Sequence, residues 1–262
     1  MNTHRWISAA LAALLALVPS AARAGPGAAT EVDWVVDGLL TGGALGLWLG
    51  SEAVKERLAP PACRWCAVNG LDRAARDAVV WSDPSKAKAL SDLLVVGVPL
   101  GVLAYDAAAT GRLRPAAEDA LLIGEAVTVA GAVAQAAKFV AARQRPYAAF
   151  GSLPSRGVDD HLSFYSAHTT VAFAAAAAGG MLARRRGDQH WPWVYGVGFT
   201  AAATTGYLRM AADKHWLTDV LVGAATGTAI GLAVPWLHRR SDGPAPVALV
   251  GTPVWVGIHG RF

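Results

Sequence analysis

The chain has 262 residues, which is enough for one large domain with a sizeable core. Hydrophobic residues make up 54% of it and charged residues only 16%, well below the roughly 25% of an average soluble domain. The mean hydropathy of +0.35 favours a membrane protein or a deeply buried helical bundle over an ordinary soluble enzyme. The net charge of +4 is too small for the basic stripe of a nucleic-acid binder, so we expect no nucleic-acid partner.

The N-terminal residues have the pattern of an export signal. A cationic start, MNTHR, precedes the apolar stretch WISAALAALLALV, and the small residues Ala22 and Ala24 flank Arg23 as in a cleavage site. We therefore expect residues 1–24 to be a signal peptide, with an uncleaved anchor helix as the alternative. In an exported protein, Cys63 and Cys66 of the sequence CRWC favour a local structural disulfide.

Six segments have the composition of helices, which predicts an all-α fold, a bundle of about six helices embedded in the membrane. Residues 34–49 are short and glycine-rich, and a polar stretch follows them. The others approach the roughly 20 residues that cross a bilayer; they are residues 93–109, 120–142, 166–183, 193–210 and 216–237. Because many of these residues are alanine, insertion is marginal, and a compact periplasmic bundle is the alternative.

The segments divide the chain into four parts. A signal peptide (1–24) precedes an N-terminal helix and polar loop region (25–91), a helical core (92–240) and a C-terminal tail (241–262). Apolar and small residues alternate in the tail, PVALVGTPVWVGIHGRF, which indicates a short hairpin.

Arginines lie between alternate pairs of segments and after the last segment. They are Arg112, Arg114, Arg184, Arg185, Arg186, Arg239 and Arg240. If the five segments of the core span the membrane, these arginines share one face, which the positive-inside rule assigns to the cytoplasm. That orientation agrees with a cleaved signal peptide only if residues 34–49 do not cross, as their short length and acidic flanks indicate.

Two groups of polar residues lie on the opposite, periplasmic face. In KFVAARQRPY, Lys138 and Arg145 are two helical turns apart, and Arg143 lies between them. Three cations at the end of an apolar helix require solvent or an anion. In SFYSAHTT, Ser166 is placed as the N-cap of a helix that contains His168. The free N–H groups of a helix start favour an anion.

A third group, LRMAADKHWLTDV, reaches the same face. Arg209 ends one helix, while His215 and Asp219 begin the next at a spacing of four, which places them on one helix face. A carboxylate beside an imidazole fixes its tautomer and leaves the other ring nitrogen free to attack or to exchange protons. Since an unpaired carboxylate in this apolar run is costly, we expect His215 to be the partner of Asp219. Taken singly, each group is also typical of ordinary helix ends and surface pairs.

Together, K-x6-R-P, S-A-H and R-x5-H-x3-D resemble the three-part signature of the type 2 phosphatidic acid phosphatase superfamily. This superfamily includes bacterial acid phosphatases and vanadium haloperoxidases. The resemblance departs at Tyr165, Ala167 and Leu208, where the family usually has proline, glycine and serine. Ala167 matters most, because its backbone N–H should face a phosphoryl oxygen and glycine gives that group the most freedom.

The resemblance implies a metal-independent phosphatase that acts through a phosphohistidine. His215 would attack phosphorus, Asp219 would orient it, and His168 would protonate the leaving oxygen. The implied phosphate-binding residues are Lys138, Arg145, Ser166, Ala167 and Arg209. So many fixed positive charges could replace Mg²⁺, and we therefore expect no metal and no cofactor.

We expect the substrate to be a phosphorylated lipid, with its headgroup in a periplasmic site at the bacterial inner membrane. The alternative is a soluble periplasmic acid phosphatase that takes small phosphate esters on the same scaffold. A vanadium haloperoxidase is less favoured, because those enzymes resemble larger and more polar chains. A non-catalytic membrane bundle has support only from Ala167. The sequence does not indicate the oligomeric state.

Overall fold

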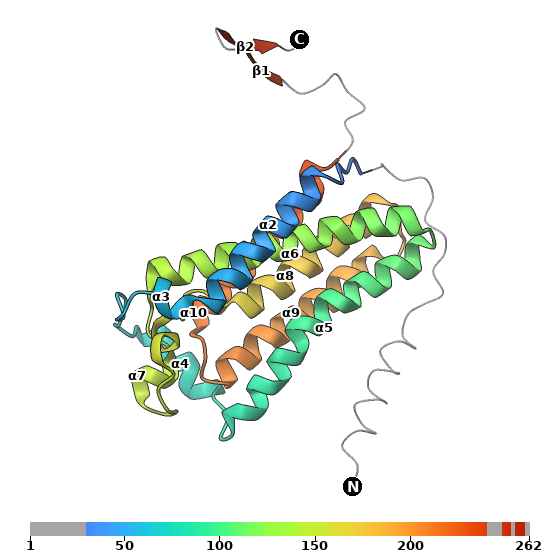
Figure 1. Ribbon diagram of the computed structural model, residues 1–262. Coiled ribbons are helices and arrows are strands. Elements are labelled where there is room, and N and C mark those ends of the chain that lie inside the picture. The colour runs from blue at the N-terminus through green and yellow to red at the C-terminus, as the bar shows by residue number, and fades with distance from the viewer. Residues whose placement is uncertain (1–29, 240–247, 253–254, 260–262) are drawn as a thin grey trace.

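The computed structural model describes residues 30–239, 248–252 and 255–259 (Figure 1). The signal peptide predicted for residues 1–24 lies outside them. Six long helices lie side by side within this part of the chain: α2 (Val36–Ala53), α5 (Pro84–Thr110), α6 (Leu113–Ala141), α8 (Ala167–Arg185), α9 (Trp191–Ala211) and α10 (Leu217–Leu237). The predicted all-α bundle is thus confirmed.

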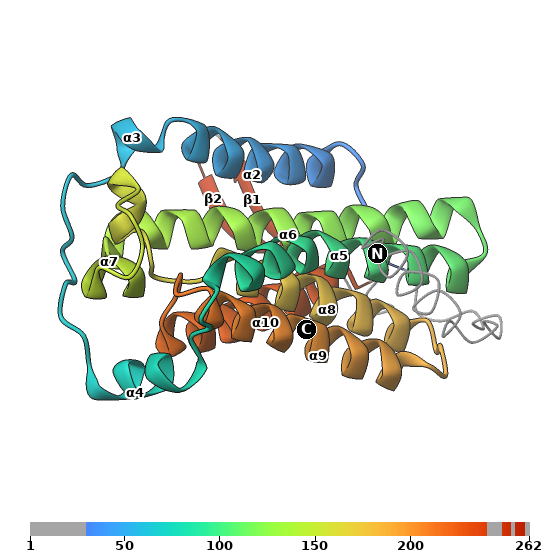
Figure 2. The same ribbon diagram turned by 90° about the horizontal axis from the view of Figure 1, so that it is seen from below.

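Shorter elements close one end of the bundle, as Figure 2 shows. They are α3 (Lys55–Leu58), α4 (Gly70–Val79), α7 (Pro146–Phe150) and the 3-10 turn η1 (Gly157–His161). Beyond the bundle, β1 (Ala248–Thr252) and β2 (Trp255–His259) pair as an antiparallel hairpin, the element predicted for the tail.

Two long helices begin earlier than their apolar segments do. Helix α5 begins at Pro84 rather than at residue 93, because Asp83 accepts a hydrogen bond from the Ser85 N–H (3.1 Å) and proline suits the first helical position. Helix α6 begins at Leu113 rather than at residue 120. Apolar composition marks only the inner part of each helix. The added turns of α5 bring Asp92 into the described helix.

Helix α2 runs alongside α6 from one end of the bundle toward the other (Figure 2). Near its start, Asp37 Oδ1 lies 3.2 Å from His238 Nε2 at the end of α10, and near its end Glu52 accepts a hydrogen bond from Gln135 (2.9 Å). Asp37 is therefore paired inside the bundle, whereas the exposed Glu52 contacts α6 at its surface. Its outer face carries exposed leucines: Leu39, Leu40, Leu47 and Leu49.

Helix α2 has 18 residues whereas α6 has 29, and α2 is not among the described helices that are long and apolar enough to cross a membrane. The expectation that residues 34–49 do not cross therefore stays a prediction, and so does the compartment of each face.

Among the described residues, three helices, α5, α6 and α10, are long and apolar enough to cross a membrane. Helix α8 is enclosed by its neighbours α5, α6, α9 and α10. Its run of alanines, residues 174–178, is fully buried, so these side chains meet protein instead of lipid. An alanine-rich helix can therefore occupy the centre of the bundle although its own hydropathy is modest.

The arginine clusters of the described residues meet at one end of the bundle. Arg186, at the end of α8, donates to Asp106 of α5 (2.9 Å) and to the carbonyl oxygen of Pro115 in α6 (3.0 Å). Arg185 donates to the Pro235 carbonyl oxygen of α10. The predicted gathering on one face is confirmed up to Arg239, since Arg240 lies outside the described residues.

Helices α8 and α10 approach closely along three glycines of α10, Gly223, Gly227 and Gly231. A Cβ atom at Gly227 would collide with the carbonyl oxygen of Thr170, and one at Gly231 with that of Ala174. Small residues spaced by four allow two backbones to meet in this way. The contact fixes the start of α10 against the start of α8.

We predict that Gly227→Ala lowers the free energy of unfolding by about 1–3 kcal/mol, because the added methyl group must push the two backbones apart. The measurement is the midpoint of thermal unfolding in detergent. Gly97→Ala on α5 is the matched control, since a Cβ there meets nothing within 4 Å. Equal midpoints for the two variants would contradict this account of the helix contact.

Candidate active site

All predicted site residues lie at the end of the bundle opposite to the arginines. Lys138 lies in the last turn of α6 and Arg209 in the last turn of α9. Arg145 precedes α7, and Ser166 caps α8. His215 and Asp219 lie on either side of the first residues of α10. The start of α8 touches the start of α10 directly, because the Ser166 N–H donates to the Asp219 carbonyl oxygen (3.2 Å).

His215 is buried, with 3% of its surface exposed. Its Nδ1 lies 2.8 Å from the carbonyl oxygen of Ser163. Because a carbonyl oxygen only accepts, Nδ1 carries the proton and Nε2 keeps its lone pair. Burial, and then the charges of Arg145 and Arg209, hold the pKa of His215 well below its usual value. The imidazole is thus a neutral base with one free nitrogen.

The contacts of Asp219 differ from the expected pairing with His215. Its Oδ2 is 3.6 Å from His215 Nδ1, which is too long for a hydrogen bond. The carboxylate instead accepts from Arg143 (2.6 Å), from the Ser163 hydroxyl (2.5 Å) and from the Trp216 N–H (3.0 Å). A fully buried carboxylate needs a full positive charge, which a neutral imidazole does not supply. Asp219 is therefore a neighbour of His215 whose main partner is Arg143.

Arg143 is buried between two carboxylates. One end of its guanidinium meets Asp219, and NH2 meets Asp72 of α4 at 2.5 Å. Asp72 also accepts from the Thr218 N–H (2.9 Å). Although burial opposes it, these hydrogen bonds from Thr218 and Arg143 keep the pKa of Asp72 below its ordinary value. The anion that the KFVAARQRPY stretch requires at Arg143 is thus supplied by the protein itself.

The predicted local disulfide, Cys63–Cys66, is present. The loop that it closes runs beside the segment that carries Arg143, where the Gln144 N–H donates to the Trp65 carbonyl oxygen (3.0 Å). The Trp65 ring lies 4.0 Å from the Arg143 guanidinium carbon. The disulfide loop therefore covers the buried arginine, which is a structural role.

Arg145 is held in a different way. Its Nε donates to the Asp159 carbonyl oxygen (2.6 Å) and its NH1 to the Lys214 carbonyl oxygen (3.2 Å). Carbonyl groups orient a guanidinium without neutralising it, so this charge is available to an anion. Arg209 is 5% exposed, and its buried Nε has no hydrogen-bond partner in the described part of the chain. Lys138 is partly buried in the last turn of α6.

Lys214 is a cation that the motifs do not include. It precedes His215, and its ammonium lies 4.1 Å from the centre of the Tyr147 ring. Burial and the nearby charges of Arg156 and Arg145 lower its pKa to about 8. Its position beside His215 in the sequence is the only signal that could have found it.

His168 has a carboxylate partner that sequence reasoning missed. Its Nε2 lies 3.0 Å from Asp92 Oδ1, and the same oxygen is 3.4 Å from Arg209 NH1. Because the expected helix began at residue 93, Asp92 lay just outside it and was not among the predicted site residues. The cap formed by Asp83 and Pro84 is the signal that would have included it.

Ser166 and Ala167 form the start of α8. The Ser166 hydroxyl accepts from the Thr169 N–H (3.4 Å), as its predicted N-cap role requires. Ala167 is the first helical residue, and alanine is the best helix former. The replacement of glycine therefore adds no backbone strain. The N–H groups of Ala167 and His168 lack helical partners and can meet an anion.

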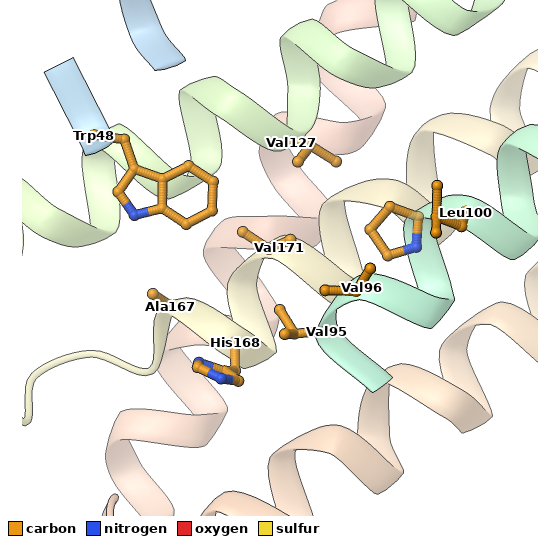
Figure 3. A pocket seen from close by; sticks show the side chains of 9 residues that line it. Trp48, Val95, Val96, Leu100, Val127, Ala167, His168 and Val171 are labelled. Carbon is orange, nitrogen blue, oxygen red and sulfur yellow. The ribbon is translucent and has the colours of Figure 1, made fainter. Parts of the chain in front are cut away.

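An apolar cavity of about 300 Å³ opens beside these residues (Figure 3). Side chains from α2, α5, α6 and α8 line it, and His168 is its one polar lining residue. Figure 3 shows His168 and Ala167 at one side, with Trp48, Val96 and Leu100 around the cavity. A hydrocarbon chain fits such a lining.

Comparisons with known proteins concern the family and the fold. Residues 119–242 match the PAP2 superfamily. Over 88 residues the chain is 36% identical to a protein named lipid A 1-phosphatase from Porphyromonas gingivalis, covering 34% of this chain and 19% of that protein. The chain therefore spans only a minor part of the length of this curated relative.

Among solved structures, the fold is similar to that of a transmembrane PAP2 type phosphatidylglycerolphosphate phosphatase from Bacillus subtilis. The TM-score is 0.50 at 19% identity, and the match covers 77% of this chain and 94% of that chain. The three apolar helices of the bundle fit a membrane protein of this fold. Residues 119–242 thus match the PAP2 superfamily, and the described bundle has the fold of a transmembrane PAP2 phosphatase.

Proposed function

We propose that this protein is a phosphatase that hydrolyses phosphorylated lipids through a phosphohistidine, without a metal at the reacting centre. The observation that carries the proposal is the protonation state of His215 and the positive charge near it. Its Nδ1 proton is held by the Ser163 carbonyl, Nε2 keeps its lone pair, and the charges of Arg145 and Arg209 lower the pKa of the ring. A nucleophile and a binding site for phosphate oxygens therefore share one place.

In the first step, the Nε2 lone pair of His215 attacks phosphorus and forms a P–N bond. The bond from phosphorus to the leaving oxygen breaks, and that oxygen takes a proton from His168. Lys138, Arg145 and Arg209 neutralise the nonbridging oxygens, with the arginine forks providing directed hydrogen bonds. The Ser166 hydroxyl and the first N–H groups of α8 add further donors.

In the second step, water attacks the phosphohistidine. His168 accepts a proton from this water, the P–N bond breaks, and its electron pair returns to Nε2. Inorganic phosphate leaves, and both histidines regain their starting protonation states. Asp219, 3.6 Å from Nδ1, stabilises the positive charge that the ring carries while it is phosphorylated. Asp219 thus acts on His215 through its charge rather than through a direct hydrogen bond.

The apolar cavity supports a lipid as the substrate. His168, the residue that would protonate the leaving oxygen, lines one side of it, so a hydrocarbon chain in the cavity would bring its phosphate toward this histidine. Both named relatives act on phosphorylated lipids according to their names. A small phosphate ester would leave this cavity unused, which disfavours the soluble acid phosphatase. The arginines at the opposite end support a periplasmic site at the inner membrane.

The first prediction concerns the nucleophile. His215→Ala should lower kcat by about 10³-fold or more, because no other group can form the covalent intermediate. Phosphate release by detergent-solubilised protein in EDTA measures this, with phosphatidic acid, an isoprenyl diphosphate and an aryl phosphate as substrates. His190→Ala, near the opposite end, is the control. Release that persists in His215→Ala would overturn the mechanism, and a preference for the aryl phosphate would overturn the lipid assignment.

The second prediction concerns pH. Since burial and nearby cations lower the pKa of His215, the acid limb of kcat/KM should lie well below pH 6.5. Arg145→Gln removes one of these cations, so protonation of His215 becomes easier and the limb should move to higher pH. Because wild type and variants are compared on the same substrate, the ionisation of that substrate affects all of their pH profiles in the same way. Arg114→Gln, exposed at the far end, should leave the limb in place, and an unmoved limb in Arg145→Gln would contradict the proposal.

The third prediction concerns the buried ion pairs. Asp72→Asn should lower kcat about tenfold with little change in KM, because Arg143 loses a partner and holds Asp219 less firmly. It should also cost about 3–5 kcal/mol of stability, as expected when a buried pair is broken. Kinetics and thermal unfolding measure the two effects. Asp77→Asn, exposed on the same helix, is the control, and a lower midpoint with unchanged kcat would assign the network to stability alone.

A further inference from the structure

A second cluster of polar residues lies at the end of the bundle remote from the candidate active site. It joins Asp37 of α2, Glu125 of α6 and His238, which follows α10. One ligand atom from each residue lies within 4.8 Å of the others. His238 Nε2 is 3.2 Å from Asp37 Oδ1 and 3.9 Å from Glu125 Oε2. Three helices distant in sequence thus direct a nitrogen and two oxygens at one point.

Each of the two outer ligands is already oriented by a backbone group. His238 Nδ1 lies 2.8 Å from the Val234 carbonyl oxygen, so Nδ1 carries the proton and Nε2 faces the carboxylates with a lone pair. Asp37 Oδ2 accepts from the Asp33 N–H (2.9 Å), which leaves Oδ1 for the cluster. This is the arrangement by which proteins fix metal-binding histidines and carboxylates.

Glu125 is the group that a simple ion pair does not explain. It is 6% exposed, and its Oε2 has no hydrogen-bond partner among the described residues. A buried carboxylate oxygen without a partner is costly in the interior of a membrane bundle. Among the described residues, Asp37 and Glu125 each form an ion pair with His238 and with no other cation. A single imidazolium would leave one of the two negative charges uncompensated.

We propose that Asp37, Glu125 and His238 bind a divalent transition-metal ion, with Zn²⁺ as the best match to one imidazole and two carboxylates. The two carboxylates balance its charge, and the neutral imidazole adds a nitrogen ligand. Bonds of about 2.1 Å in a tetrahedron place ligand atoms roughly 3.4 Å apart, so only a small closure of the cluster is needed. A water molecule completes the four ligands, and the ion fastens α2 to α6 and α10.

This site is separate from the proposed phosphatase reaction. The ion lies at the start of α2 and the end of α10, beside the middle of α6, and touches none of the residues that would bind phosphate. The proposal therefore stands whether or not the protein hydrolyses lipid phosphates, and it leaves the expectation of metal-free chemistry at His215 unchanged.

The test is Co²⁺ binding by the full chain in detergent, with any affinity tag removed and bound metal stripped by EDTA and desalting. We expect one Co²⁺ per chain with the visible absorption bands of four-coordinate cobalt, which Zn²⁺ bleaches. Glu125→Gln, which keeps the shape of the side chain, should weaken this binding about tenfold or more. Glu118→Gln on the same helix is the matched control, because Glu118 pairs with Arg114 outside the cluster.

Thermal unfolding gives a second readout that does not depend on colour. Zn²⁺ at about a hundredfold excess over its Kd should raise the midpoint of wild type by about 5–10 °C and should not raise that of Glu125→Gln. His238→Asn should behave like Glu125→Gln. Octahedral cobalt bands alone, or equal binding and equal stabilisation in wild type and both variants, would overturn the proposal and assign the cluster to an ion pair of His238 with the carboxylates.

Discussion

The close approach of α10 to α8 is the constraint on which the candidate site depends. Because Gly227 and Gly231 lack side chains, the two backbones meet, and the starts of the helices come together. The Ser166 N–H then reaches the Asp219 carbonyl oxygen, and His215 reaches Ser163. The two histidines of the proposed reaction thus come from adjoining helix starts. A wider separation of the helices would part the nucleophile from the general acid.

Charge is divided between structure and chemistry at this end of the molecule. Arg143 is paired with two buried carboxylates and stabilises the loops that hold Asp219. Arg145 is held by carbonyl oxygens and keeps its charge for a ligand. Two arginines separated by one residue therefore have opposite roles. The difference follows from their partners, because only carboxylates neutralise a guanidinium.

The two ends of the bundle differ in what they can bind. The end with His215 presents uncompensated cations beside an apolar cavity, which suits a phosphate on a hydrocarbon chain. The other end presents two carboxylates with one imidazole, which suits a divalent cation. Helix α2 contributes to both, since Trp48 lines the cavity and Asp37 belongs to the acidic cluster. Docking of α2 against α6 therefore links both ends.

The sequence by itself determined the helical class and the motif residues from Lys138 to Asp219, because helical spacing and residue type act locally. Only the tertiary structure decided the partner of Asp219. Asp72 and Arg143 pair with each other across a long stretch of chain, and no local pattern connects them. Asp92 was missed for a related reason: apolar composition marks the part of α5 inside the bundle, whereas its polar first turns are recognised by their cap and by what they contact. Burial and pairing depend on which helices meet, which no single segment encodes.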